Sequence, residues 1–250
     1  MHWVAHGERE LPSTDGWLSE RESAQVATIR FTKRRSEYLT RRWTAKHAVA
    51  TVLGLDHTPN SLATVEIRNR ETGAPYVEVD REPAAVDLSL SDRAGWAVCL
   101  VGSAGSAAAG SLGIDLEVVE PRTDRFVTDF FTVREAEYVL GLPAGDPRNE
   151  AANLLWSAKE AALKLQQGGL RADTRTVEVT LDHDVDPDGW SSLIVTASSG
   201  RRMPGWWRRD GVFLSTIAFA DRRPPPQLLA GGADLTGAEP LHSWVDRPVV

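Results

Sequence analysis

The chain has 250 residues, of which 42% are hydrophobic and 25% charged, and it carries a formal net charge of −7. This composition is ordinary for a soluble globular protein, and the negative charge argues against general nucleic-acid binding. We expect neither a secretory signal nor a membrane span, and the single cysteine, Cys99, cannot form an internal disulfide, so the chain is predicted to be cytoplasmic.

Charge is segregated along the chain. Between residues 30 and 46 a single acid, Glu37, stands among seven basic residues: Arg30, Lys33, Arg34, Arg35, Arg41, Arg42 and Lys46. Between residues 115 and 124 the balance reverses, with one basic residue, Arg122, among Asp115, Glu117, Glu120 and Asp124. Such zones suit a ligand that is both phosphorylated and metal-bound, although charge alone favours two solvated faces.

The first half of the chain predicts a helix followed by strands. Apolar spacing indicates a helix over residues 19–54, with Gly54 as its stop. Alternating apolar and polar residues predict four strands, at 65–67, 76–79, 87–91 and 96–101. Residues 103–111 consist of Gly, Ser and Ala and are expected to form a linker.

The second half repeats this order of elements. A strand at 112–117 is followed by a helix at 150–167, which stops at Gly168, and by strands at 176–181, 192–197 and 212–220. We therefore predict an α+β fold of two pseudo-symmetric lobes, 1–111 and 112–221, each a small sheet packed on a long helix. The repeat is in the order of elements and not in matching residues. Residues 222–250 are expected to be a surface tail or disordered.

The strand at 112–117 carries two acids on one face. Because side chains two apart in a strand point the same way, Asp115 and Glu117 project together. Paired carboxylates suit a magnesium ion that protein and substrate phosphates hold jointly. Alone, the pair is more typical of a solvated strand end, and we expect Asp115 to be exposed there.

The helix at 150–167 carries a second set of charges. Its apolar stripe, which must pack on the core, comprises Leu154, Ala158, Ala161, Ala162 and Leu165. Glu160 and Lys164 lie one turn apart on another face, and Lys159 lies a quarter-turn from Glu160. These residues predict either an ordinary surface ion pair or a carboxylate and an ammonium that hold a metal and a phosphate.

Together, the two segments resemble the signature motifs of the 4′-phosphopantetheinyl transferase superfamily. The motifs are Gly113-Ile114-Asp115-Leu116-Glu117 and Trp156-Ser157-x-Lys159-Glu160-Ala161-x-x-Lys164. The match is to the two-lobed type that activates peptide and polyketide synthase carrier proteins, with its active site between the lobes. More loosely, the resemblance extends over residues 19–220.

The resemblance implies roles for the matching residues. Asp115, Glu117 and Glu160 would coordinate Mg²⁺ with the coenzyme A pyrophosphate, and Glu160 would also act as the base that deprotonates the carrier serine. Lys159 and Lys164 would hold the phosphates, and Lys164 would assist catalysis. The implied reaction transfers 4′-phosphopantetheine to a carrier-protein serine and releases adenosine 3′,5′-bisphosphate. A monomer is implied as well.

The part of the site that should hold coenzyme A departs from the family. Arg42 and Lys46 are the plausible counterparts of the family's basic patch. The alanine of Gly73-Ala74-Pro75 replaces a usual lysine, for which Arg68 or Arg70 is a possible substitute. Ser91-Asp92 stands where relatives have Ser-His, with the histidine on a phosphate. A carboxylate there would cost about 4 kcal/mol at ~4 Å if the dielectric is ~20, so we expect Arg93 to supply the positive charge.

Two alternatives stay open at this stage. The chain is either an active transferase or a transferase-fold protein with lost or altered activity, which binds a carrier domain or a different diphosphate ligand. Trp206 and Trp207, beside two arginines, are expected to cap a core at a turn rather than to stack on adenine.

Overall fold

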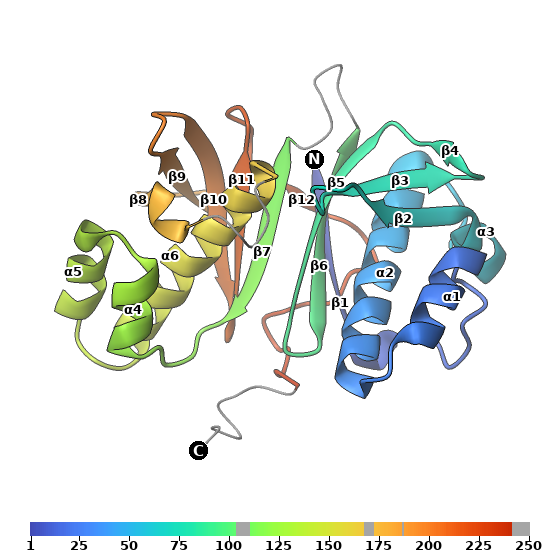
Figure 1. The fold of residues 1–250 in the computed structure, drawn as a ribbon, viewed down its shortest axis with the longest axis horizontal. Helices are drawn as coiled ribbons and strands as arrows, with labels where there is room; N and C mark the ends of the chain where they lie inside the picture. The colour runs from blue at the N-terminus through green and yellow to red at the C-terminus, as the bar shows by residue number, and fades with distance from the viewer. Residues whose placement is uncertain (104–110, 168–172, 187, 242–250) are drawn as a thin grey trace.

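The structure is a computed structural model that describes residues 1–103, 111–167, 173–186 and 188–241. Most of the expected linker, and the expected helix stop at Gly168, lie outside these residues. Two halves lie side by side, each with a sheet toward the centre and a long helix outside it (Figure 1). The predicted α+β class is confirmed. In the described part of the chain, no helix is long and apolar enough to cross a membrane.

The first half contains two sheets. One has the order β12-β1-β6-β5, and the other the order β2-β3-β4. The strands are β1 (His2–Gly7), β2 (Val65–Asn69), β3 (Pro75–Val79), β4 (Glu82–Pro83), β5 (Val86–Arg93), β6 (Trp96–Ser103) and β12 (Gln227–Leu228). The helices are α1 (Glu20–Thr28), α2 (Thr32–Leu53) and α3 (Pro59–Thr64), with a 3-10 turn at Glu8–Glu10.

The second half contains one antiparallel sheet of order β7-β11-β10-β9-β8. Its strands are β7 (Leu112–Val118), β8 (Val177–Val185), β9 (Ser191–Ala197), β10 (Arg202–Asp210) and β11 (Phe213–Phe219). The helices are α4 (Asp124–Phe130), α5 (Val133–Gly141) and α6 (Asp146–Leu165), with a 3-10 turn at Thr174–Thr176. The two halves share a buried apolar cluster that includes Trp3 and Leu100 from one sheet and Ile114 and Phe219 from the other.

The helix expected over residues 19–54 is two helices, α1 and α2. Ser19 begins α1 with a capping box, in which its hydroxyl accepts from the Glu22 backbone N–H and Glu22 accepts from the Ser19 N–H. The chain then becomes extended at Ile29 (ψ 107°) and Phe31 (ψ 122°) before α2 starts. Gly54, in the left-handed region at φ 67°, ends α2 as predicted.

A buried ion pair joins α1 and α2 in the first half. Lys46 Nζ lies 2.5 Å from Glu22 Oε2 and donates to the carbonyls of Trp17 and Leu62, both at 3.0 Å. Glu22 Oε1 accepts from the Ile67 backbone N–H at 3.2 Å. The Lys46 side chain is fully buried, and these three partners all belong to the first half.

The second half repeats this pair. Lys159 Nζ lies 2.7 Å from Glu135 Oε2 and donates to the carbonyls of Thr174 (2.9 Å) and Val177 (2.5 Å). Glu135 Oε1 accepts from the Val179 N–H at 2.8 Å. Like Glu22, Glu135 is the third residue of a capping box, here begun by Thr132.

The internal repeat therefore extends to individual residues, which corrects the expectation that it lies only in the order of elements. The Lys46–Glu22 pair recurs 113 positions later as Lys159–Glu135, and residues that flank the lysine on the helix recur at the same offset. The matching segments are Trp43-Thr44-Ala45-Lys46-x-Ala48 and Trp156-Ser157-Ala158-Lys159-x-Ala161. These segments lie at equivalent positions on α2 and α6, so the two lobes share one packing scheme.

The C-terminal segment is built into the fold as far as residue 241, which corrects the expectation of a surface tail or disorder. Gln227 and Leu228 pair with β1, and Leu229 and Leu235 are buried. The segment contacts both halves, because the Trp206 indole donates to the Arg223 carbonyl and the Trp96 indole to the Glu239 carbonyl, each at 2.9 Å.

The sequence analysis missed β10, one strand of the second half's sheet. Trp206 and Trp207 lie within this strand, paired with Ile217 and Thr216 of β11. They do not form a turn as expected. The strand contains Pro204 and Gly205, which weaken the alternating pattern by which strands are recognised.

Candidate active site

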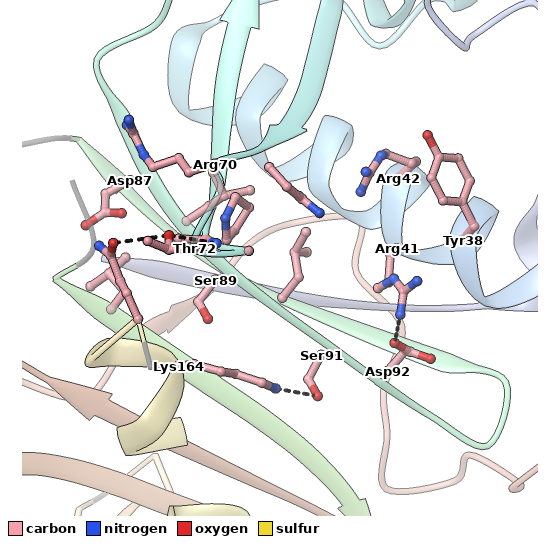
Figure 2. Close-up of a pocket in the computed structure, with 18 of the residues that line it drawn as sticks. Tyr38, Arg41, Arg42, Arg70, Thr72, Asp87, Ser89, Ser91, Asp92 and Lys164 are labelled. Atoms are coloured by element: carbon pink, nitrogen blue, oxygen red, sulfur yellow. Dashed lines mark hydrogen bonds and ion pairs between the residues drawn. The ribbon is translucent and has the colours of Figure 1, made fainter. Parts of the chain in front are cut away.

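A cleft of about 1180 Å³ opens between the two halves. One wall comes from α2, the β2–β3 turn and β5, and the other from β7 and the C-terminal half of α6. Figure 2 shows the polar side chains that line it, with Arg41 and Arg42 on α2 facing Ser91 and Asp92 on β5. The cleft brings together residues that are far apart in the sequence.

Asp115 is the centre of a hydrogen-bonded group that includes Ser91 and Lys164, two residues that line this cleft. Its Oδ1 lies 2.8 Å from both Lys164 Nζ and Ser91 Oγ, and its Oδ2 accepts from Ser157 Oγ at 2.8 Å. The expectation that Asp115 is exposed at a strand end is wrong, because it lies within β7 and is 6% exposed. Its charge is therefore held by three donors in a largely dry environment.

Gly113 explains how β7 and α6 come so close. A Cβ atom at residue 113 would lie 1.9 Å from the Ala161 carbonyl oxygen. Any side chain here would push the helix away from the strand and break the Ser157–Asp115 bond. The glycine of the first motif thus has a packing role, because it lets the backbone of α6 at Ala161 lie against β7.

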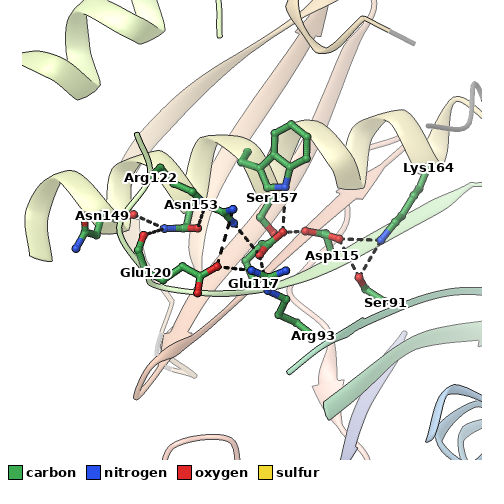
Figure 3. A network of polar contacts seen from close by, with 11 residues as sticks. Ser91, Arg93, Asp115, Glu117, Glu120, Arg122, Asn149, Asn153, Ser157 and Lys164 are labelled. Atoms are coloured by element: carbon green, nitrogen blue, oxygen red, sulfur yellow. Dashed lines mark hydrogen bonds and ion pairs between the residues drawn. The ribbon is translucent and has the colours of Figure 1, made fainter. Parts of the chain in front are cut away.

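Glu117 is more deeply engaged than a solvated strand end would be. Its Oε2 contacts Arg93 Nε at 3.2 Å and Arg122 Nη2 at 3.0 Å, and its Oε1 accepts from the Trp156 indole at 2.9 Å (Figure 3). Burial, reinforced by the neighbouring Asp115, raises the pKa of Glu117 to about 7, and the two arginines oppose this rise.

Glu160 lines the cleft from α6 and lies within electrostatic range of Asp115. Burial, together with the Asp115 charge, raises the pKa of Glu160, whereas Lys164 acts to lower it. The alternative of a plain Glu160–Lys164 surface ion pair is not what the structure shows, because Lys164 contacts Asp115, Ser91 and the Ile114 carbonyl.

Three carboxylates thus converge from β7 and α6, and two of them have raised pKa values because of burial and their neighbours' charge. Oxygen donors of this kind fit a hard divalent cation, whose charge would relieve their repulsion. Among the residues that the structure describes, however, no three potential ligands are close enough together to hold an ion. Glu117 in particular is turned toward Arg93 and Arg122.

The opposite wall of the cleft is basic but partly neutralised. Arg42 lies on it, stacked on the Tyr38 ring at 4.5 Å and 3.6 Å from Glu22 Oε1. Arg41, whose role the sequence analysis missed, lies 2.5 Å from Asp92 Oδ1. The carboxylate that replaces the family's histidine therefore faces the cleft and is paired with an arginine one helix turn from Tyr38.

Three predicted phosphate contacts are not brought to the cleft. Arg93 points to Glu117 and Glu120 instead of taking the histidine's place, since neighbouring strand residues face opposite sides. Lys46 and Lys159 are fully buried in the Lys–Glu pairs. In the structure, therefore, the charged groups of these three residues contact protein carboxylates. Burial lowers the pKa of both lysines, and the partner glutamates oppose this.

The turn that carries Ala74 does line the cleft, as the resemblance implied. Of the two arginines considered as replacements for the usual lysine, Arg70 lines the cleft and stacks on the Tyr76 ring at 5.1 Å. Arg68 instead pairs with Glu78 at 2.8 Å. Arg70 is therefore the better placed cation.

The comparisons with known proteins agree with the motifs. The family model of the 4′-phosphopantetheinyl transferase superfamily matches residues 111–189, which include β7, α4, α5, α6 and β8. The resemblance seen in the sequence is thereby confirmed over these residues, which are similar to that superfamily. No curated protein matches the chain. The match supports phosphopantetheinyl transfer in general terms.

Proposed function

We propose that the protein transfers the 4′-phosphopantetheine arm of coenzyme A to a serine of an acyl or peptidyl carrier protein, with Mg²⁺ bound at the base of the cleft. The observation that carries this proposal is that Lys164, which lines the cleft with Glu160, is paired with Asp115, and that the other wall of the cleft is basic. A diphosphate needs cations on one side and a metal held by carboxylates on the other.

Each residue would have a distinct part in this reaction. Asp115 and Glu160 would hold the ion, which would neutralise charge on the diphosphate. Glu117 would join them by turning away from Arg93 and Arg122. Glu160 would accept the proton from the carrier serine, and its raised pKa suits a base that works near neutral pH. Lys164 would stabilise charge on the departing bisphosphate.

The test is transfer of mass to a carrier. The protein is incubated with Mg²⁺, coenzyme A and several apo carrier proteins, and each carrier is examined by mass spectrometry for the added phosphopantetheine. We expect transfer, its loss in EDTA and its recovery with excess Mg²⁺. No transfer with coenzyme A still bound would favour a carrier-binding protein, and no coenzyme A binding would favour a different diphosphate ligand.

The variant that tests the site is Asp115→Asn. It keeps the shape of a buried side chain, whereas Asp115→Ala would leave Lys164 and Ser157 without their partner. We expect transfer to fall by about 10²-fold or more, the scale on which lost transition-state contacts act. The matched control is Asp15→Asn, an exposed aspartate paired with Arg35, which should transfer at the wild-type rate.

A further inference from the structure

Three of the six histidines of the chain meet in the first lobe, away from the cleft. His6 lies on β1, His47 on α2 and His57 in the loop that follows α2. The ring centroids are 5.3 Å apart for His6 and His47 and 4.7 Å apart for His47 and His57. They line a cavity of about 280 Å³, together with Glu10 and the C-terminal segment at Gly231.

The strand position of this cluster matches that of the acidic site. In the first lobe, β1 runs beside β6, and His6 is opposite Ala97, the second residue of that strand. In the second lobe, β7 runs beside β11, and Glu117 is opposite Leu214, again the second residue. His6 is therefore the structural counterpart of Glu117.

The helix position matches as well. His47 follows Lys46 on α2 just as Glu160 follows Lys159 on α6, and both lysines occupy the same place in their buried ion pairs. The cluster is thus the first lobe's version of the carboxylate site, with imidazole nitrogens where the second lobe has carboxylate oxygens. Segment 229–231 lies against it and contributes to its cavity.

Two ring nitrogens in the cluster are buried without a protein partner, namely His6 Nδ1 and His47 Nε2. His6 is only 4% exposed, so its free nitrogen is an unusual cost in a folded interior. Burial lowers the pKa of His6 and lowers that of His47 to about 4.

We propose that this histidine cluster binds a divalent transition-metal ion of the Zn²⁺ type, separate from the magnesium of the cleft. Imidazole ligands select such ions, whereas magnesium prefers oxygen. The Nδ1 atoms of His47 and His57 share a hydrogen bond at 2.9 Å, and two nitrogens on one tetrahedral zinc are about 3.3 Å apart, so a bound ion would take the place of the shared proton, which is released to solvent.

No three described ligands are yet close enough together to hold the ion, so binding requires the three rings to shift toward one another. His57 is exposed on a loop, so its position can adjust when the ion binds. His6 supplies its unpaired Nδ1 as the third ligand, and Glu10 lines the same cavity and holds the fourth position directly or through water. Binding would thus fix β1, α2 and the loop to one another.

The test is calorimetric titration of untagged, metal-free protein with Zn²⁺ in millimolar Mg²⁺, which occupies oxygen-rich sites. Co²⁺ absorbance then reports the ligand type. We expect one Zn²⁺ per chain and the visible bands of a nitrogen-ligated, tetrahedral Co²⁺ site. His47→Gln and His57→Ala should each weaken binding roughly tenfold or more. His2→Ala, on the same strand as His6 but outside the cavity, should not change it.

His57 is exposed, so its variant keeps the fold even if His47→Gln does not. Absence of saturable binding, or binding of wild-type strength in the His57→Ala protein, would overturn the proposal. Because the readout is binding in excess Mg²⁺, the result is independent of whether the chain transfers phosphopantetheine.

Discussion

In the second lobe, α6 brings Glu160 to a large cleft and β7 brings Glu117 against Arg93 and Arg122, and burial raises the pKa of both acids. In the first lobe, the equivalent elements β1 and α2 bring His6 and His47 to a small cavity, where burial lowers the pKa of both imidazoles. The two pairs of residues thus lie at equivalent backbone positions, but the first lobe has imidazoles where the second has carboxylates.

What the two lobes keep in common separates scaffold from chemistry. Both keep a lysine that holds a capping-box glutamate and two backbone carbonyls, so Lys46 and Lys159 belong to the scaffold. They differ at the next helix position, where His47 replaces Glu160. Lys159, inside a signature motif, therefore has a structural contact here, whereas Glu160 beside it lines the cleft.

The largest expected effect tests the shared scaffold. Lys46→Met and Lys159→Met should each lower the free energy of unfolding by about 3–5 kcal/mol, because each leaves a glutamate buried without its cation. Urea denaturation measures this. Equal losses in the two lobes would match the shared geometry, whereas a loss below 1 kcal/mol in either would contradict it.

The double variants Lys46→Met/Glu22→Gln and Lys159→Met/Glu135→Gln serve as controls. Each removes both charges of a pair, so no uncompensated charge stays buried, and each should be more stable than the corresponding single variant. If a double variant is as unstable as its single, the loss comes from packing and not from the stranded carboxylate.

The second prediction concerns the opposite titration of the two lobes. Glu117 is protonated at a higher pH in the folded chain than in the unfolded chain, so without metal its contribution to stability should fall as the pH rises from about 4.5 to about 7. Asp115, Arg93 and Arg122 are the charged groups that face it. Glu117→Gln should remove this slope, at most about 1.4 kcal/mol per pH unit.

His47 should act in the other direction. Its pKa is about 4 in the fold and 6.5 ordinarily, so its contribution is present above pH 6.5 and is lost as the pH falls toward 4. His6 and His57 face it and carry the same sign when protonated. In His47→Gln the loss of stability on acidification should shrink. Urea titrations in EDTA between pH 4.5 and 7.5 measure both slopes, and slopes of the same sign would contradict the comparison.

The sequence predicted the second lobe's site better than the first lobe's. Asp115, Glu117 and Glu160 could be found because strand and helix periodicity and a family resemblance marked the same residues. Their burial could not be predicted, since it depends on Gly113 letting α6 approach β7. A search for self-similarity at one fixed offset would have found the repeated Trp-x-Ala-Lys segment and with it the role of both lysines.

Residues that act across the fold were beyond sequence reasoning. The pairing of Arg41 with Asp92 joins a helix to a strand, and the course of residues 222–241 over both halves depends on contacts such as Leu235 with the shared core. Periodicity carries no information on such long-range contacts. For the same reason Arg93 was assigned to the cleft, although the alternation of β5 turns it toward Glu117.

The smallest expected effect concerns a strand-to-helix ion pair that the two lobes build with reversed charges. In the first lobe Asp92 on β5 pairs with Arg41 of α2, and in the second Arg209 on β10 pairs with Glu150 and Asp146 of α6.

In the first lobe both partners line the cleft, so a phosphate that binds Arg41 must compete with the Asp92 carboxylate for it. Asp92→Asn should therefore tighten coenzyme A binding by up to about tenfold, the effect of roughly 1.4 kcal/mol. Calorimetric titration measures this, and Arg41→Gln should weaken binding by a similar factor. If instead Asp92→Asn weakens binding, Asp92 orients Arg41 for the phosphate rather than competing with the phosphate. The Asp92–Arg41 pair would then belong to the coenzyme A site.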